Sequence, residues 1–473
     1  MNETQREQIR NNARYLRQVR PIDPEEIATY VEGHPHPAAV RRVLRESATE
    51  LGLSERSDGR FEPAPTGPVS LEPTVERLPE RYARRLEELL VDRFGPGWPD
   101  GKSGDRLRER IRAFKRAYLR GEAVTYDELT ALGYAVYHLP AYFAATQHAL
   151  AELTAEDLLG GRLRVLDVGA GVGGPALGLA AALPEDALVE YHAVEPSPAA
   201  DVLAALLEET GRNVHPTIHR ERIQAHEPAG PFDLVLCANV LGELLEPVEV
   251  VCELLGALAA DGTLLALSPA DRRTAVELRE TERAVLERTD AGVYAPTVRL
   301  WPDAEPAGEC WSFTRQEPIE TPGFQRRLDQ GRRVDSGNEG EPGDGEFVNA
   351  DVQYAYSALR TDGRTAISVT PGEGTARMAE TDEHVTDRAD FLAVKLSHDL
   401  AEAGNPLYLI GDGSERTDHF AVLVKQTGLN RALGTAEYGD VLAIENGLVL
   451  WNDDEEAYNL VVDGETIVDR VPG

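Results

Sequence analysis

The stretch Arg164-Val165-Leu166-Asp167-Val168-Gly169-Ala170-Gly171-Val172-Gly173-Gly174-Pro175 decides the fold of this chain. An apolar, β-branched run ends in a carboxylate, and a glycine-rich turn then leads into a helix whose start is marked by Pro175. Alternating glycines let a ligand approach the backbone closely, where any Cβ would collide. The free N–H groups of the helix expected at 176–183 point at this turn. The stretch therefore predicts a nucleotide-binding βα unit.

Two carboxylates bear on which nucleotide is bound. Gly169, Gly171 and Gly174 also fit the dinucleotide pattern G-x-G-x-x-G, which is weak evidence when it stands alone. Asp167 would repel a pyrophosphate, but it suits S-adenosylmethionine (SAM), whose methionine end carries an ammonium group and a sulfonium. Glu195 follows the next predicted strand and can accept both ribose hydroxyls, a device that NAD sites also use.

A third strand favours SAM. The run Phe-Asp-Leu-Val-Leu-Cys-Ala-Asn-Val-Leu at 232–241 has the form of the fourth strand of SAM methyltransferases, and 262–267 predicts the fifth strand. We therefore predict an α/β, Rossmann-like SAM-dependent methyltransferase domain over 151–365. An NAD site and a structural Rossmann unit with an empty pocket are the alternatives. The residues expected to bind the donor are Asp167, Gly169, Ala170, Gly171, Gly173, Glu195, Ala238 and Asn239.

The composition is strongly acidic. The 473 residues carry a net charge of −34, and only four of the 48 basic residues are lysines. Acid excess with few lysines is typical of a cytoplasm with molar salt, as in halophilic archaea. At such salt the Debye length is about 3 Å, so an acidic protein can still approach RNA. The polar, arginine-rich start has no apolar signal segment and no run has membrane-spanning length, so we expect a soluble, cytoplasmic protein without a membrane partner.

The charge is unevenly distributed along the chain. Residues 1–120 hold 23 basic against 20 acidic residues, a balance of +3, whereas the remainder has a balance of −37. A polyanion partner explains this difference, and burial of the N-terminal region against another domain is the alternative. Within 1–66, three helices and a turn at 57–61 resemble a winged helix, a module that docks nucleic acid or protein.

A basic helical region is expected at 74–150, after a Pro/Gly linker. Four arginines recur there every four positions, opposite an apolar stripe, which predicts a shared positive face for phosphate contact; a merely solvated face is the alternative. These expected RNA-binding residues are Arg108, Arg112, Arg116 and Arg120. Beyond a mobile insert at 334–346 and a polar linker at 371–390, short strands spaced about ten residues apart predict a small OB-like β-barrel at 388–473.

Several motifs resemble one family, the methyltransferase-like small-ribosomal-subunit proteins of the Rsm twenty-two type, with the mitochondrial methyltransferase-like protein seventeen among its relatives. This chain looks like a haloarchaeal-type member. The similar segments are the Tyr/Pro helix 134–142, the glycine loop 167–171, Ala-Asn-Val-Leu-Gly-Glu-Leu at 238–244, Cys-Trp-Ser-Phe-Thr-Arg at 310–315, the strand 352–359 and Tyr-Gly-Asp at 438–440. The resemblance implies a SAM-binding protein that acts on small-subunit ribosomal RNA or the ribosomal particle.

The cysteines depart from the family's pattern. Many members hold an iron–sulfur cluster on four cysteines, but this chain has only Cys237, Cys252 and Cys310, and Thr297 stands near the first of the family's positions. Of the family's cysteine positions, only that of Cys310 is kept in this chain. Because one thiolate cannot hold a cluster, we expect no iron–sulfur cluster and no metal.

The catalytic group is less well marked than the donor site. The fourth strand continues as Asn-Val-Leu-Gly, without the Pro-Pro-aromatic sequence of many amino-methylating enzymes. Cys237 stands two residues too early for a pyrimidine-attacking nucleophile and lies inside a core strand. Asn239 and Glu243 face the donor by position and are the expected catalytic residues, although Glu243 could equally pin the loop. The functions compatible with this pattern are an rRNA methyltransferase or assembly factor, a catalytically silent RNA-binding scaffold, and a small-molecule methyltransferase.

Overall fold

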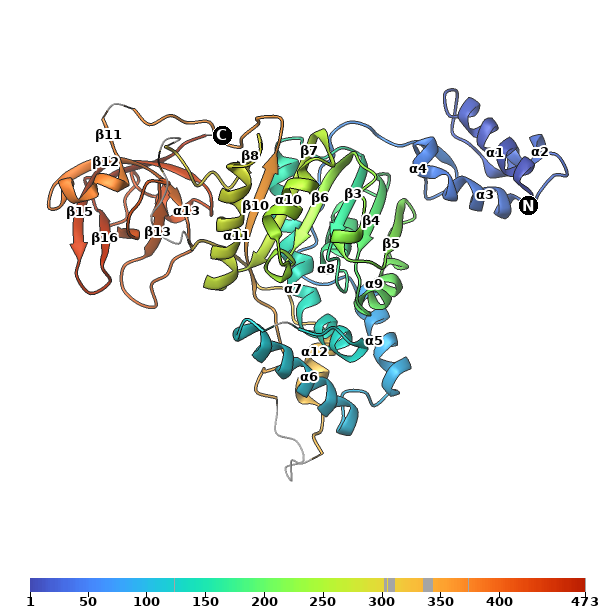
Figure 1. Ribbon diagram of the computed structural model, residues 1–473, viewed down its shortest axis with the longest axis horizontal. Helices are drawn as coiled ribbons and strands as arrows, with labels where there is room; N and C mark the ends of the chain where they lie inside the picture. Colours follow the sequence, from blue (N-terminus) through green and yellow to red (C-terminus); the bar gives the residue numbers. More distant parts are fainter. Residues whose placement is uncertain (123, 302–303, 305–310, 335–342, 373, 473) are drawn as a thin grey trace. The chain divides into compact units, whose positions relative to one another are not determined.

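A computed structural model of the chain describes residues 1–122, 124–301, 304, 311–334, 343–372 and 374–472 (Figure 1). The chain forms two compact units. The first comprises Met1–Ala238, Ala257–Gly262 and Glu317–Val352. The second comprises Asn239–Gly256, Thr263–Gln316 and Gln353–Gly473. Among the described residues, every helix is too short or too polar to span a bilayer.

The N-terminal segment has the helices and hairpin expected of a winged-helix-like module. Asn2 and Gln5 form a capping box on the first helix, and Asp23 caps the second. The third helix ends at Glu46 rather than near 51, because Ser47 leaves helical geometry and a separate turn follows. The elements are α1 (Glu3–Leu16), α2 (Pro24–Tyr30), α3 (Pro37–Glu46), α4 (Ala48–Leu51), β1 (Leu53–Glu55) and β2 (Phe61–Pro63).

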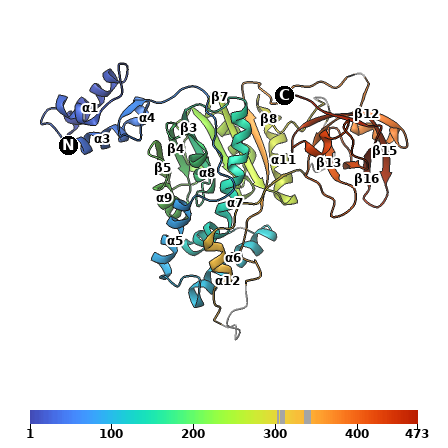
Figure 2. The same ribbon diagram turned by 180° about the vertical axis from the view of Figure 1, so that it is seen from behind.

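A helical region follows, and it includes a helix from much later in the chain. Its members are α5 (Glu80–Phe94), α6 (Gly101–Leu119), α7 (Glu128–Ala155) and α12 (Gly323–Gln330). α12 packs against α5 and α7, and it lies beside α6 in both views (Figures 1 and 2). Segment 317–352, predicted as part of the SAM domain, therefore packs with this helical region. Most of the predicted mobile insert at 334–346 lies outside the described residues.

A proline inside α7 explains why this late segment packs there. Pro140 has no N–H, so it cannot bond to the Val136 carbonyl one turn earlier. Gln325 Nε2 donates to that carbonyl at 2.8 Å, and Asn349 Nδ2 donates to the neighbouring Tyr137 carbonyl at 3.1 Å. Two amide side chains thus replace the hydrogen bonding that the proline disrupts.

The Rossmann-like sheet was predicted correctly in its central strands. Hydrogen-bonded neighbours follow the order β5-β4-β3-β6-β7-β10-β8, with β9 beside β10. β3 to β6 pair in parallel, and the central strands β3 and β6 are mostly buried, whereas β7, β10 and β8 pair antiparallel. The strands are β3 (Arg162–Val168), β4 (Leu188–Val194), β5 (Val214–His219), β6 (Phe232–Ala238), β7 (Leu258–Pro269), β8 (Gly292–Ala295), β9 (Thr314–Gln316) and β10 (Val352–Arg360).

Helices and short turns connect these strands. α7 packs closely against α8, as Figure 2 shows. In the second unit α10 packs against α11. These elements are α8 (Gly174–Ala182), α9 (Ala199–Leu207), η1 (Ile223–Ala225), η2 (Leu241–Glu243), α10 (Pro247–Leu255) and α11 (Arg272–Leu286).

The C-terminal part of the second unit is a closed five-stranded barrel, as expected. β12 pairs with β13, then β14, β16 and β15 follow, and β15 returns to β12. β14 and β16 are parallel, so the strand order is that of an OB-fold. The elements are β11 (Thr375–Ala376), η3 (Met378–His384), β12 (Arg388–Lys395), β13 (Leu407–Gly411), β14 (His419–Leu423), α13 (Ala432–Thr435), β15 (Val441–Asn452), β16 (Ala457–Val462) and β17 (Ile467–Arg470).

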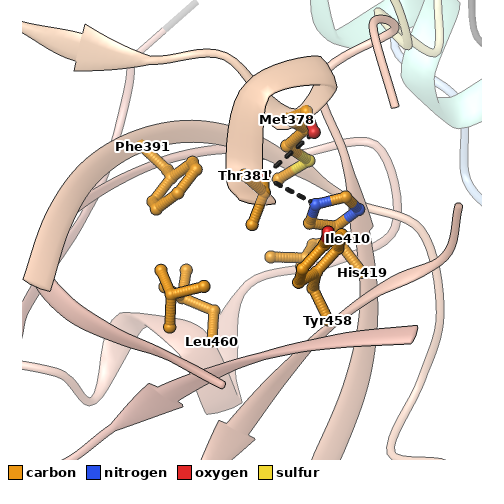
Figure 3. Close-up of a pocket in the computed structure, with 8 residues that line it drawn as sticks. Met378, Thr381, Phe391, Ile410, His419, Tyr458 and Leu460 are labelled. Carbon is orange, nitrogen blue, oxygen red and sulfur yellow. Dashed lines mark hydrogen bonds between the residues drawn. The ribbon is translucent and has the colours of Figure 1, made fainter. Parts of the chain in front are cut away.

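Two expectations for this barrel were wrong. Not all of its strands are short: β15 runs from Val441 to Asn452 and continues through Asn446 at a positive φ of 61°. The predicted polar linker contains β11 and η3, because Met378 enters the barrel core and is 2% exposed. Inside the barrel His419 bonds to Thr381 at 2.8 Å (Figure 3). The cavity beside them has a volume of about 10 Å³, which is room for one water rather than a ligand.

Candidate functional site

The glycine loop after β3 has the backbone conformation that its sequence predicts. Gly169, Gly171 and Gly173 have φ values of 65°, 54° and 93°, which favour glycine. A Cβ on Gly173 would lie 2.7 Å from Leu203, whereas a Cβ on Gly171 would meet nothing closer than a carbonyl oxygen at 3.8 Å. Gly173 is therefore needed for packing, and Gly171 leaves room beside the loop. Ala170 lies in the same loop and is buried.

Asp167 is a buried carboxylate with an unused oxygen. Its Oδ2 accepts a hydrogen bond from the Tyr191 hydroxyl, and its Oδ1 is buried without a partner among the described residues. Burial raises the pKa of Asp167 to about 7, although the Tyr191 bond opposes the shift and the charge of Glu195 adds to it. Such an acceptor suits a cationic ligand, because a nearby positive charge would stabilise the ionised form. Tyr191 was not predicted, since tyrosines in strands usually serve only packing.

Glu195 holds the glycine loop. Its Oε2 accepts from the Gly171 N–H at 2.9 Å, and its Oε1 accepts from the Ser197 N–H at 2.8 Å. Each carboxylate oxygen keeps a further lone pair, so ribose hydroxyls can still donate to both. Asp167, the loop and Glu195 thus lie together at the carboxyl ends of β3 and β4, as predicted. Residues in this arrangement fit a SAM molecule bound by its ammonium and ribose groups.

The fourth-strand residues are divided between the units. Ala238 ends β6 in the first unit, and Asn239 begins the second. Asn239 has a φ of 58°, an uncommon conformation for a residue with a side chain, and its N–H donates to the Leu267 carbonyl at 2.8 Å. Glu243 is exposed at the end of η2. Burial raises the pKa of the Cys237 thiol, which agrees with the expectation that it is not a nucleophile.

The predicted arginine face on α6 is wrong at its first member. Arg108 is 1% exposed and donates to the carbonyls of Pro99 and Leu328 at 3.0 and 2.7 Å. Arg112 is half-buried and forms an ion pair with Glu346. Four residues of an α-helix turn about 400°, so residues spaced by four shift by about 40° around the helix at each step. The four arginines therefore do not share one face, and the series passes from the packed side of α6 to its exposed side.

The outward face of α6 is nevertheless mostly basic, with the exposed acid Glu109 among its cations. Arg116 and Arg120 are exposed, as predicted, and the same face also presents Lys102 and Arg106. Within the described residues, the one ion pair in this set joins Arg120 to Glu122 at 3.9 Å. We call Lys102, Arg106, Arg116 and Arg120 the basic α6 face.

The N-terminal module differs from the basic α6 face in that most of its arginines pair with acidic residues of the module itself. The ion pairs join Arg6 to Glu46, Arg10 to Glu3, Arg14 to Glu50, Arg20 to Glu26 and Arg45 to Glu55. The module also packs on the first unit, where Asn213 bonds to both backbone groups of Glu55. Ion pairs within the module thus occupy the arginines named here.

Three family models match parts of the chain. Residues 166–264 match a methyltransferase domain. Residues 6–57 match the N-terminal domain, and residues 379–471 the C-terminal domain, of a family described as a domain of unknown function (DUF8157). A comparison with curated proteins found no match.

Solved structures similar to the chain include several methyltransferases. A SAM-dependent methyltransferase from Clostridium acetobutylicum is 12% identical with a TM-score of 0.25, and the match spans 36% of this chain and 60% of that one. The mitomycin 7-O-methyltransferase MmcR is 18% identical with a TM-score of 0.27, over 61% and 88%. A protein from Methanococcus maripaludis, titled a putative SAM-dependent methyltransferase, is 12% identical with a TM-score of 0.31, over 36% and 89%. These scores are too low to support a conclusion about function.

The family match and the site geometry agree independently. The matched segment begins within β3 and ends within β7, so it contains Asp167, the glycine loop, Glu195 and the Asn239 turn. Residues 166–264 therefore lie in a methyltransferase domain of the SAM-dependent class.

Proposed function

We propose that this protein uses its SAM domain on RNA of the small ribosomal subunit, as an rRNA methyltransferase or as a SAM-binding assembly factor. Bound SAM supplies an electrophilic methyl group. Asp167 would hold its ammonium group, Glu195 its ribose, and the loop from Gly169 to Gly173 would lie along the donor. Asn239 and Glu243 are the proposed groups at the methyl end.

The observation that carries the RNA proposal is the basic α6 face. Four exposed cations share one helix side in a chain whose net charge is −34. Arginine binds phosphate through paired hydrogen bonds, which survive molar salt better than a point charge does. The motifs similar to those of the small-ribosomal-subunit family support the same target.

The barrel is a less suitable RNA surface, although OB-folds often bind nucleic acid. The loops joining their first two and last two strands are usual contacts. Here the second of these loops, 453–456, reads Asp-Asp-Glu-Glu and is exposed. Its charge would repel phosphate, so the proposal places RNA on α6.

The test replaces three arginines of the basic α6 face together. The Arg106→Glu, Arg116→Glu, Arg120→Glu variant should lose co-sedimentation with small ribosomal subunits while it binds SAM like the wild type. Arg108 is left in place because its substitution would disturb packing. A matched control carries the same charge change on exposed arginines elsewhere: Arg222→Glu, Arg416→Glu and Arg431→Glu. Equal loss in both variants, or none in the first, would contradict the RNA site.

A second function, a catalytically silent SAM-binding scaffold, is favoured by one observation. Cys237 is buried with a raised thiol pKa, so the chain has no cysteine nucleophile at this strand. Mass mapping of small-subunit rRNA from a deletion strain and its parent separates the two functions. A methyl group missing from the deletion strain supports the enzyme. Identical methylation together with an assembly defect supports the scaffold.

A further inference from the structure

A histidine cluster lies at the carboxyl ends of β4 and β5, outside the residues assigned to the donor. His192 comes from β4, His219 ends β5, and His226 follows η1. The side chains of His192 and His226 are 16% and 9% exposed. Glu190 and Glu221 complete the group. Three imidazoles and two carboxylates meet here, and Arg164 Nε lies 3.4 Å from Glu190 Oε1 at the outer end of the group.

Hydrogen bonds within the cluster define the protonation of two rings. Glu190 Oε1 lies 2.9 Å from His192 Nε2, so a carboxylate acceptor requires the proton on Nε2 and leaves His192 Nδ1 as an acceptor. His192 Nδ1 lies 3.2 Å from His219 Nε2, which must then be the donor. The neutral His219 ring is left with a free lone pair on Nδ1.

The ligand atoms are close enough for one ion. One atom each from His219, Glu221 and His226 lies within 4.8 Å of the others. His226 Nδ1 and Glu221 Oε1 are 2.8 Å apart, and the His219 and His226 ring centroids are 4.5 Å apart. Neighbouring ligands around tetrahedral zinc, with bonds of about 2.0–2.1 Å, are roughly 3.3 Å apart. The proton between His226 and Glu221 can therefore be exchanged for a metal by small side-chain shifts.

We propose that His219, Glu221 and His226 bind one divalent transition metal of the zinc class, and that Glu190 and His192 orient the His219 ring. Two imidazoles and a carboxylate suit zinc, cobalt or nickel, and three protein ligands leave a position for water. Zinc-ligating histidines usually donate their second ring N–H to a supporting acceptor. Here the acceptor for His219 Nε2 is His192 Nδ1, and Glu190 in turn holds His192. A metal at these residues departs from the sequence-based expectation of no metal, which was argued from the cysteines and did not consider these histidines.

The metal would fix the segment after β5 beside the donor site. The Glu195 N–H donates to the His219 carbonyl at 2.9 Å, so the backbone of a ligand adjoins the backbone of the ribose-binding carboxylate. Metal binding at 219–226 would restrict the motion of the backbone at this edge of the sheet. The proposal does not depend on the RNA target.

The test measures metal binding by the full chain. After removal of metals with a chelator, zinc is titrated against a chromophoric competitor, and cobalt binding is followed by its visible absorption. We expect one equivalent with a Kd below about 1 µM and a cobalt spectrum of low coordination number. His226→Ala and Glu221→Gln should each weaken binding about 100-fold or more, and Glu190→Gln about 10- to 100-fold.

Two control variants separate this site from adventitious binding. Glu227→Gln changes a neighbouring exposed acid, and His34→Ala removes an exposed histidine in the N-terminal module; both should bind zinc like the wild type. Circular dichroism without metal checks that each variant is folded, and Glu221 is exposed enough for its amide to be tolerated. Wild-type binding weaker than about 100 µM, or equal binding by His226→Ala and Glu221→Gln, would overturn the proposal.

Discussion

Two buried aspartates, Asp167 in β3 just before the glycine loop and Asp412 in the barrel, differ in how many hydrogen bonds they accept. Asp412 accepts from the Ser414 N–H and hydroxyl, the Trp301 indole and the Met378 N–H, at 2.7 to 2.9 Å. Asp167 accepts one bond, from Tyr191, and its second oxygen has no partner among the described residues. Both side chains are 0% exposed. Burial alone thus does not distinguish a structural carboxylate from a ligand-binding one, whereas the unfilled oxygen does.

The largest effect is expected from Asp412→Ala. Three residues would lose the acceptor for buried donors, so the free energy of unfolding should fall by about 3 kcal/mol or more. Urea unfolding followed by tryptophan fluorescence measures this loss, and SAM affinity measured below the transition should stay within about twofold of the wild type. A stable Asp412→Ala protein would show that the barrel does not depend on this network.

Asp167→Ala should have the opposite effect: SAM affinity should fall strongly, and stability to urea should change little. A cationic donor would lose its buried acceptor, and its affinity should fall about 100-fold, or about 2.7 kcal/mol. Unfolding in urea should change little or become harder at pH 8, because a buried charge with one hydrogen bond has been removed. Calorimetry with SAM provides the measurement, and NAD serves as the competing ligand. Wild-type affinity for NAD but not SAM would contradict the donor assignment.

The smallest effect concerns pH. Because the pKa of Asp167 is about 7 in the folded chain, SAM affinity should fall roughly tenfold from pH 8 to pH 6 as the carboxyl is protonated. For folding alone the sign is reversed: a raised carboxyl pKa means that the folded state binds more protons, so this contribution to stability declines as pH rises from about 4 to 7. Asp167→Asn should remove both slopes. A pH-independent SAM affinity in the wild type would show that the ionised form is not required.

Local sequence patterns predicted the strands and turns better than the surfaces. The end of strand β10 was predicted to within one residue. The glycine loop was predicted from its alternating glycines, three of which have a positive φ in the structure. Tyr191 was missed because its role depends on a partner in the adjacent strand. Arg108 was misplaced because α12, more than 200 residues later, covers its side of α6. The histidine cluster depends in the same way on strand register, in which Val194 lies opposite His219.

The proline in α7 has a consequence for synthesis on the ribosome. Gln325 satisfies the Val136 carbonyl that Pro140 leaves without a partner. Asn349 donates to the neighbouring Tyr137 carbonyl, and these donors follow their acceptors by 189 and 212 residues. Until then, the middle of this long helix has exposed carbonyls and lacks the helix that packs beside it. The first unit consequently cannot complete the hydrogen bonding of α7 until segment 317–352 is translated, after strands β7, β8 and β9.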